Sequence, residues 1–325
     1  MKTKLLFNLA LFIMAFFTFG CSASEDDLCS EDVDDTEYVE VPIGLVGEIL
    51  DVEESPLSRA NSAKDWYAFQ VYAKDISAKY PYYYRYAYGF FDNKEDMVIN
   101  LKKGYEYKFD VQMIKDGSQK VYSFSLQNAG WTGIGNSFFI SSDEGVRYMY
   151  EGYLYLEYPS DTFDRPDVDR FFGRTEGFVP QEGKSVDINM KRVSFGVKFV
   201  PKNFKEGNLE ISIEGAPMIY MDSYKDKEVK KIISFNRLES AYMSSSEYSE
   251  DIAVNIVWVK PDNKRVPIAS QAVTFKRNKL MTISFEVKEQ TEKSSFNLKT
   301  DEVMEEGETV EIGGDGTNTD VIPDK

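Results

Sequence analysis

The chain is poor in the side chains that most often carry out catalysis. Its 325 residues include two cysteines, Cys21 and Cys29, and no histidine. Without histidine the chain has no Ser-His-Asp or Cys-His nucleophile system, no histidine-ligated zinc and no histidine general base. We therefore expect a protein that is not an enzyme and that needs no cofactor.

Carboxylates offer two further kinds of chemistry, metal binding and glycoside hydrolysis. One cluster comprises Asp161, Asp164, Asp167 and Asp169. Calcium loops use such oxygens, but at a different spacing, and neighbouring arginines offset the charge of this cluster. Hydrolysis requires two acids that face each other, which a sequence does not show. We interpret the cluster as a solvated loop and expect no metal site.

Tyrosines form the most unusual candidate for ligand or partner contact. Residues 80–91 contain Tyr82, Tyr84, Tyr86 and Tyr88, which would share one face of a strand. Exposed tyrosines stack on sugars or form protein contacts, because they supply a large rigid area at low entropy cost. The alternative is that these rings fill the core of a thick sandwich.

Trp131 is a second aromatic candidate, in the glycine-rich segment 128–135. This segment is not a phosphate loop, because it lacks the Gly-Lys-Ser/Thr ending and a following helix. We expect Trp131 either to contact a sugar or partner or to plug the end of a sandwich.

The amino terminus has the features of a secretory signal. A short basic start precedes an apolar run at residues 5–19, which ends in Gly20-Cys21. The run is at the short end for crossing a bilayer. A small residue directly before a cysteine resembles a bacterial lipobox, although the two preceding residues depart from the usual motif. This implies removal of signal peptide 1–20 and attachment of diacylglycerol and palmitate to Cys21. The alternative is an ordinary signal peptide in which Cys21 is incidental.

Acidic residues are concentrated in two tails. Residues 22–37 hold eight acids and no base, and residues 301–325 hold nine acids and one base. The body at 38–300 has 38 acidic and 35 basic residues, so the net charge of −17 belongs mainly to the tails. A nearly neutral body lacks the basic surface that nucleic acid requires. We expect an extended acidic tether at 21–37, and a tail at 301–325 that adds at most one strand before it becomes disordered.

The body alternates apolar and polar residues as half-buried strands do. Clear examples lie at 66–72, 97–101 and 105–113. A longer strand is expected at 186–200, with a bulge at Gly196. Many short strands separated by turns predict an all-β protein built from β-sandwiches.

The length of the body predicts two such domains. Turn-forming residues at 181–184 give the best boundary between them. We therefore expect an amino-terminal β-sandwich at 38–183 and a carboxy-terminal β-sandwich at 184–300.

Three stretches are similar to the fimbrillin-like proteins of Bacteroidetes, the lipoprotein subunits and anchors of type V pili. The stretches are 55–60 followed by 66–72, 88–92 followed by 97–101 and 105–109, and 186–195. The likeness consists of strand patterns and covers most of the body. It implies two tandem Greek-key, transthyretin-like β-sandwich domains.

The same resemblance implies a route of assembly. Fimbrillin subunits exchange strands after an arginine-specific protease has cut the chain, which is a form of β-augmentation. Arg59-Ala60 is the candidate cleavage site, because it lies in a polar loop at 53–65 after the first expected strand. The alternative is an ordinary exposed arginine.

The leading hypothesis is an outer-membrane surface lipoprotein that acts as a structural, anchoring or adhesive subunit of a fimbria. The acidic residues behind Cys21 favour display on the cell exterior. Its partners would be other fimbrial subunits, or ligands on host or bacterial surfaces. The alternative is a glycan-binding surface lipoprotein of a polysaccharide-uptake system, which would use Trp131 and the tyrosines of 80–91 as stacking platforms.

Overall fold

The chain divides into two units, Met1–Glu37 and Tyr38–Lys325, and every element described below belongs to the second. The structure is a computed structural model. It describes residues 37–48, 63–121, 123–125, 134–136, 139–141, 147–149, 154–155, 162–244, 248–288, 297–300 and 304.

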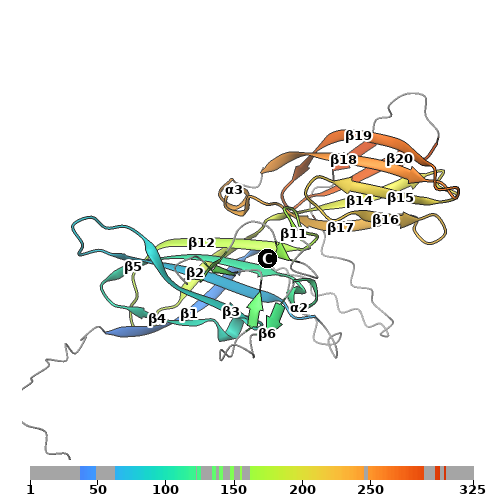
Figure 1. Cartoon of the computed structure of the whole chain (residues 1–325). Coiled ribbons are helices and arrows are strands. Elements are labelled where there is room, and N and C mark those ends of the chain that lie inside the picture. The colour runs from blue at the N-terminus through green and yellow to red at the C-terminus, as the bar shows by residue number, and fades with distance from the viewer. Residues whose placement is uncertain are drawn as a thin grey trace, which may run out of the picture. The chain divides into compact units, whose positions relative to one another are not determined.

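The amino-terminal part of the second unit is built on a seven-stranded sheet in the order β3-β2-β5-β12-β13-β1-β4 (Figure 1). Its strands are β1 (Tyr38–Gly47), β2 (Trp66–Asp75), β3 (Tyr84–Phe91), β4 (Val98–Lys102), β5 (Tyr105–Ile114), β12 (Arg170–Phe178) and β13 (Val186–Arg192). All neighbouring strands are antiparallel except β1 and β13, which run parallel.

Short elements connect these strands. They are η2 (Lys94–Asp96), α2 (Gly117–Lys120), β6 (Ser123–Ser125), β7 (Ile134–Asn136), β8 (Phe139–Ser141), β9 (Arg147–Met149), β10 (Leu154–Tyr155) and β11 (Thr162–Phe163). The last six form three two-stranded hairpins, β6 with β7, β8 with β9 and β10 with β11.

One face of the seven-stranded sheet encloses a core. Val41, Phe69, Leu101, Phe109 and Ile188 come from five different strands and are buried in one cluster. Because strands near both ends of the sheet contribute to this cluster, the sheet curls around its own apolar face. The alternation that the sequence shows at 66–72, 97–101 and 105–113 supplies Phe69, Leu101 and Phe109, so those predicted strands are confirmed.

The carboxy-terminal part is a β-sandwich of two four-stranded sheets, β17-β14-β20-β21 and β16-β15-β18-β19. The elements are β14 (Ser194–Lys202), β15 (Asn208–Ile213), β16 (Ile219–Asp222), β17 (Val229–Ser234), α3 (Leu238–Met243), β18 (Ser249–Val259), β19 (Arg265–Lys276), β20 (Leu280–Glu286) and β21 (Asn297–Thr300). Phe199 and Ile283 of the first sheet share a buried cluster with Ile211 and Val254 of the second. The predicted all-β fold is confirmed, and the Greek-key, transthyretin-like connectivity stays a prediction.

The pairing of β13 corrects the expected domain boundary. We expected residues 186–200 to form one strand of the carboxy-terminal domain. Instead β13 ends at Arg192 and pairs with β1 and β12 of the seven-stranded sheet, whereas β14 starts the second sandwich. The chain therefore changes sheets at Val193, whose backbone N–H donates to Arg170 O at 2.8 Å.

The expected bulge at Gly196 is absent. The register of β14 with β17 and β20 runs through Gly196 without a shift. A Cβ atom at this position would lie 2.9 Å from both Leu280 Cδ1 and Met304 Sδ. Close packing, rather than a bend of the strand, accounts for this glycine.

Candidate functional site

Six of the residues singled out in the sequence lie outside the described residues. They are Cys21, Cys29, Arg59, Ala60, Trp131 and Asp161. Lipidation at Cys21, cleavage at Arg59-Ala60 and ligand contact by Trp131 therefore stay predictions.

The predicted tyrosine segment forms one edge of the seven-stranded sheet, because β3 is its terminal strand. Tyr80 and Tyr82 precede this strand and are 75% and 73% exposed. Tyr84 and Tyr88 lie within it and are also exposed. We call these four residues the tyrosine edge.

A β-bulge divides this edge, so the prediction that Tyr82, Tyr84, Tyr86 and Tyr88 share one face is wrong. Val71 pairs with Ala87, but the next residue of β2 pairs with Arg85, which leaves Tyr86 as an extra residue in β3. The bulge reverses the alternation of side chains. Tyr88 consequently lies opposite Gln70 and Tyr84 opposite Ala73, on opposite faces of β2.

Tyr86 is turned toward the core rather than presented to solvent. Its hydroxyl donates to Asn100 O at 3.1 Å, and its ring lies edge-on to Tyr107 at 5.3 Å between centroids. Burial raises the pKa of both hydroxyls above the ordinary tyrosine value. Tyr86 therefore stabilises this end of the sheet, which agrees with the core interpretation for this one tyrosine.

Tyr83 contacts both an acidic and a basic side chain. Its hydroxyl donates to Glu106 Oε1 at 2.6 Å, and Lys74 Nζ lies 2.5 Å from the same oxygen. Lys74 also lies over the Tyr83 ring, at 4.8 Å from its centroid. Burial, together with the bond to Glu106, raises the pKa of Tyr83 to about 12. These contacts fix the chain where it enters β3.

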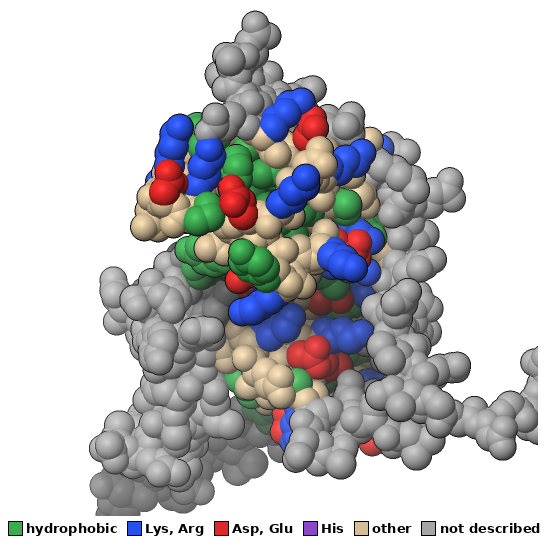
Figure 2. Space-filling view, turned by 90° about the vertical axis from the view of Figure 1, so that its right-hand side faces the viewer, with side chains coloured by type: hydrophobic (Ala, Val, Ile, Leu, Met, Phe, Trp, Pro, Cys, Tyr) green, Lys and Arg blue, Asp and Glu red, His purple; other side chains and the backbone are tan. Residues whose placement is uncertain are grey.

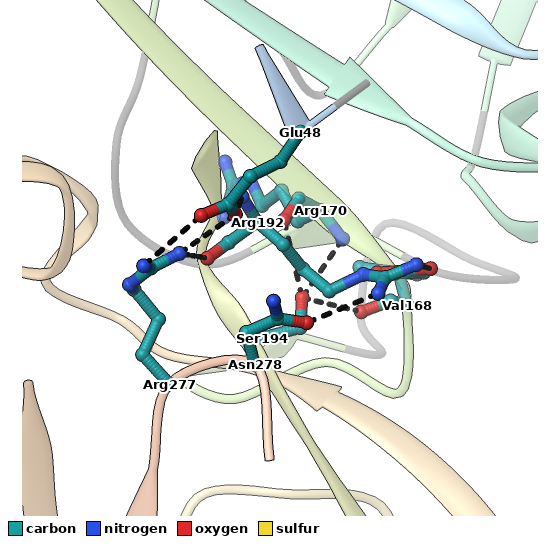
Figure 3. A network of polar contacts seen from close by, with 8 residues as sticks. Glu48, Val168, Arg170, Arg192, Ser194, Arg277 and Asn278 are labelled. Carbon is teal, nitrogen blue, oxygen red and sulfur yellow. Dashed lines mark hydrogen bonds and ion pairs between the residues drawn. The ribbon is translucent and has the colours of Figure 1, made fainter. Parts of the chain in front are cut away.

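A buried polar network joins the seven-stranded sheet to the second sandwich (Figure 3). Glu48 directly follows β1, and Arg277 lies in the turn between β19 and β20. Arg277 Nη1 donates to Glu48 Oε2 at 2.8 Å, and Arg277 Nη2 donates to Glu48 Oε1 at 3.1 Å. The backbone N–H of Arg192 donates to Glu48 Oε2 at 2.7 Å. The end of the first strand is thus bonded both to its neighbour β13 and to the second sandwich.

A second ion pair lies beside the first. Arg192 Nε and Nη2 donate to the two carboxylate oxygens of Asp169 at 3.0 and 3.1 Å, and Arg192 Nη1 donates to Asn278 Oδ1 at 3.1 Å. Asp169 is 4% exposed. Burial raises the pKa of Asp169 from its ordinary value, and Arg192 opposes this shift. Asn278, which adopts a left-handed φ of 53°, again links the two sheets through a side chain.

Arg170 is fully buried and is hydrogen-bonded to Gln112 and Ser194. Its Nε donates to Gln112 Oε1 at 2.9 Å. Its backbone N–H donates to Ser194 Oγ at 2.8 Å, which ties β12 to the first residue of β14. A buried guanidinium without hydrogen bonds would be strongly destabilising. Arg170, Gln112 and Ser194 therefore act as one structural group.

The carboxylate cluster that we interpreted as a solvated loop is solvated only in part, because Asp164 is exposed whereas Asp167 and Asp169 form separate ion pairs. Asp169 is buried against Arg192 as described, and Asp167 Oδ2 lies 2.9 Å from Lys231 Nζ. Asp161 lies outside the described residues. The sequence interpretation assumed that these charged residues are exposed. The basic partners of Asp167 and Asp169 belong to strands that follow later in the chain, so the local sequence does not reveal them.

A third contact joins α3 to β12. Arg174 donates to Asp110 through Nε at 2.5 Å and Nη2 at 2.8 Å, and it also pairs with Glu239 of α3. The hydroxyl of Tyr242 donates to Arg174 O at 3.1 Å, while its ring lies edge-on to Phe172. The described charged groups at this junction hold one another in place.

The surface charge is mixed. Figure 2 shows one face on which Lys and Arg side chains are interspersed with Asp and Glu, with hydrophobic side chains between them. No helix within the described ranges combines the length and the apolar character needed to cross a bilayer.

Sequence reasoning missed Glu48 and Arg277, which are 229 positions apart. Neither residue belongs to a motif, so no local signal identifies the pair. The missed burial of Asp169 and Arg170 had a weak signal, because this charged dipeptide directly precedes Phe171 and Phe172 at the start of a strand.

Comparisons with known proteins find likeness only among solved structures. No protein-family model matches the chain, and no curated protein matches it. A "putative adhesin" from Bacteroides ovatus is 12% identical, with 78% of this chain and 87% of that chain covered and a TM-score of 0.36. A structure of "putative polysaccharide binding proteins" from Bacteroides thetaiotaomicron is 11% identical, with coverages of 78% and 92% and a TM-score of 0.37.

A fimbrial structure is also among these neighbours. The fimbrial anchor protein Mfa2 from Porphyromonas gingivalis is 8% identical, with 76% of this chain and 90% of that chain covered and a TM-score of 0.33. The chain is similar to these proteins at low sequence identity.

Proposed function

We propose that the protein is a surface-displayed structural subunit, held to the outer membrane by a lipid on Cys21, and that it has no catalytic role. The observation that carries this proposal is the position of β1. This strand begins at Tyr38, directly after the acidic tether, and lies inside the sheet between β13 and β4. Its far end is bonded to the second sandwich through Glu48 and Arg277.

This arrangement suits a chain that is pulled at its amino end. Tension in the tether enters β1 along the strand axis, where it loads first the pairing of Tyr38–Pro42 with β4 and then the pairing of Ile43–Gly47 with β13. The Glu48–Arg277 pair then passes part of the load to the second sandwich.

The tyrosine edge is the proposed contact surface for a neighbouring subunit or surface ligand. Tyrosine offers a large contact area at low entropy cost, and Tyr82 and Tyr88 are well exposed. The glycan-binding alternative requires a continuous aromatic platform on this segment. The bulge at Tyr86 divides that platform between two faces, so the described geometry favours a protein partner here.

Strand exchange at β1 is the finer form of the proposal. Cleavage after Arg59 would separate β1 from β2, and removal of β1 would open a slot between β13 and β4 that another extended segment fits. Exposure of the purified protein to an arginine-specific protease, followed by amino-terminal sequencing, tests this step. A new terminus at Ala60 supports it, and an intact bond after exhaustive digestion removes it.

Lipid attachment is tested by metabolic labelling with an alkyne fatty acid in a Bacteroides host. We expect label on the wild-type chain and on Cys29→Ser, and no label on Cys21→Ser. Cys29 is a matched control, because it is the only other thiol and lies in the same acidic stretch. Label that persists on Cys21→Ser, or a wild-type chain recovered without lipid from the culture medium, would contradict the anchor.

Surface display is a separate measurement. Antibody against the folded body should stain intact cells that express the wild-type chain, and an external protease should remove that staining. Staining that requires permeabilised cells would place the protein on the inner side of the membrane and overturn the proposed display.

A further inference from the structure

A cavity of about 470 Å³ opens on the carboxy-terminal sandwich, on the sheet β16-β15-β18-β19. It lies on the face of this sheet that points away from the core. Leu209 and Ile211 of β15 are buried in the core, so Asn208 and Glu210 project from the opposite face. On the adjacent strand β16, Met221 is buried while Tyr220 is 68% exposed. The volume falls within the range of roughly 300–1,000 Å³ that is typical of small-molecule sites.

The strand register places an aromatic ring beside a polar floor. Tyr220 pairs with Glu210, and Asp222 pairs with Asn208. On the other side of β15, Asn208 pairs with Val259, which also lines the cavity. Because directly paired residues share a face, these side chains stand next to one another on the outer surface of the sheet.

The turn after β16 forms a wall that is held in one conformation. Asp226 Oδ2 accepts the backbone N–H of Asp222 at 2.8 Å, and Asp222 Oδ1 accepts the backbone N–H of Tyr224 at 2.8 Å. Each of these bonds uses one oxygen of a carboxylate that has capacity for further hydrogen bonds. Lys225, in the same turn, also lines the cavity. Part of the polar lining is therefore fixed before any ligand arrives.

The lining carries a net negative charge, with the carboxylates of Glu210, Asp222 and Asp226 and one amine, that of Lys225. Arg265, which does not line the cavity, donates through Nη1 to Glu210 Oε1 at 2.9 Å, and a second bond joins the same two groups. A phosphate or sulfate group would meet three carboxylates here, which disfavours an anionic ligand. Within the described residues no three acidic, cysteine or histidine side chains gather closely enough to hold a metal ion.

We infer that this cavity binds a neutral saccharide. The exposed ring of Tyr220 would pack against the C–H face of a sugar ring. The amide of Asn208 and the carboxylates of Asp222 and Asp226 would bond the sugar hydroxyls, which act as both donors and acceptors. The site is open to solvent, so one chain binds weakly, and many copies on one surface would raise the avidity.

This saccharide site is independent of the anchoring role. It lies on the second sandwich, whereas the tyrosine edge lies on the seven-stranded sheet. Fatty-acid labelling reports the anchor, and sugar titration reports the cavity, so either proposal can fail while the other stands.

Sugar binding is tested on the full mature chain by saturation-transfer NMR and calorimetry. The probes are glucose, galactose, mannose, N-acetylglucosamine and their neutral oligomers. We expect saturable binding of at least one probe, and a loss of about tenfold or more with Tyr220→Ala, because removal of a central aromatic contact has this scale of effect. Tyr220→Phe keeps the ring and should retain binding to within a few-fold.

Two controls separate the cavity from other exposed rings. Tyr38→Ala removes a ring that is 53% exposed on β1 and does not line the cavity, and it should leave binding unchanged. Tyr82→Ala, on the tyrosine edge, should do the same. Circular dichroism checks that each variant folds. Absence of binding for every neutral probe, binding unaffected by Tyr220→Ala, or a preference for sulfated sugars would each overturn the inference.

Discussion

Glu48 accepts hydrogen bonds from both terminal nitrogens of Arg277, a residue 229 positions later in the chain. Arg277 is 4% exposed, so its charge is largely removed from water and requires a partner. The pair connects the end of β1 to the turn between β19 and β20. The first strand of the seven-stranded sheet is therefore fixed by a residue of the second sandwich.

Glu48→Gln should destabilise the protein markedly. The substitution leaves Arg277 buried without an anionic partner, which costs about 2–3 kcal/mol, below the full range for a buried pair because Glu48 itself is partly exposed. Urea denaturation of the mature chain measures the change in the free energy of unfolding.

Glu40→Gln is the matched control, since Glu40 is an exposed carboxylate on the same strand. Its effect should stay within about 0.5 kcal/mol. The double variant Glu48→Gln with Arg277→Met should recover part of the loss, because the buried charge is removed together with its partner. Equal stability of Glu48→Gln and Glu40→Gln would mean that the pair contributes nothing.

Gly47→Ala tests how closely the end of β1 approaches β13. Gly47 has a φ of +90°, and a Cβ atom there would lie 2.8 Å from Met190 O as well as clashing with Asn189. We expect a loss of about 2–4 kcal/mol, from backbone strain plus overpacking. Gly177→Ala is the control, with a φ of +78° and no atom within 4 Å of its Cβ position, and should show only the strain of about 1–2 kcal/mol. Equal losses for the two variants would show that the contact with β13 is loose.

Local patterning predicts the strands of this fold but not their partners. The alternation at 105–113 is enough to identify β5, because its apolar residues recur at period two. The pairing of β13 with β1 joins segments about 140 residues apart, and no feature of either segment identifies the other as its pairing partner. For this reason the expected domain boundary fell one strand too early.

The residues of the candidate sites, like the strands, are predicted from the sequence, but their surroundings are not. The sequence identified the tyrosines of β3, but their regular alternation with Arg85, Ala87 and Gly89 conceals the bulge that turns Tyr86 inward. Asp169 and Arg170 were expected in solvent because charged residues are rarely buried alone. Their partners, Arg192 and Gln112, come from other strands, so only the tertiary structure reveals why these charges are buried.

Tyr83 predicts a pH dependence of stability at alkaline pH. Its pKa rises from 10.0 to about 12 in the folded chain. Between these values the unfolded chain has lost the proton while the folded chain keeps it, so the unfolded state binds fewer protons and stability falls as pH rises. Tyr83→Phe should remove roughly 1 kcal/mol of this fall. Urea denaturation at pH 9 and pH 11 measures the difference, and Tyr80→Phe should retain the wild-type slope. A wild-type slope in Tyr83→Phe would contradict the shift.

Tyr82→Ala and Tyr86→Phe should distinguish a role of the tyrosines in partner binding from a role in folding stability. Tyr82 is 73% exposed, so its removal should leave the unfolding free energy within about 0.5 kcal/mol but weaken recovery of partner subunits in pull-downs from the cell surface. Tyr86→Phe removes the hydrogen bond to Asn100 O and should cost about 1 kcal/mol without changing the pull-down. The opposite pattern would show that the tyrosine edge is structural.

The most direct test of the anchoring account is forced unfolding of single molecules pulled from the tether. One handle is attached at Cys21 of the non-lipidated mature chain carrying Cys29→Ser, and the other at Tyr224→Cys on the second sandwich. We predict that β1 stays paired with its neighbouring strands until the whole sheet unfolds. In Glu48→Gln we predict a separate, earlier step in which β1 is released at lower force. Release of β1 as the first low-force event in the otherwise wild-type chain, at a force that Glu48→Gln does not change, would contradict the account.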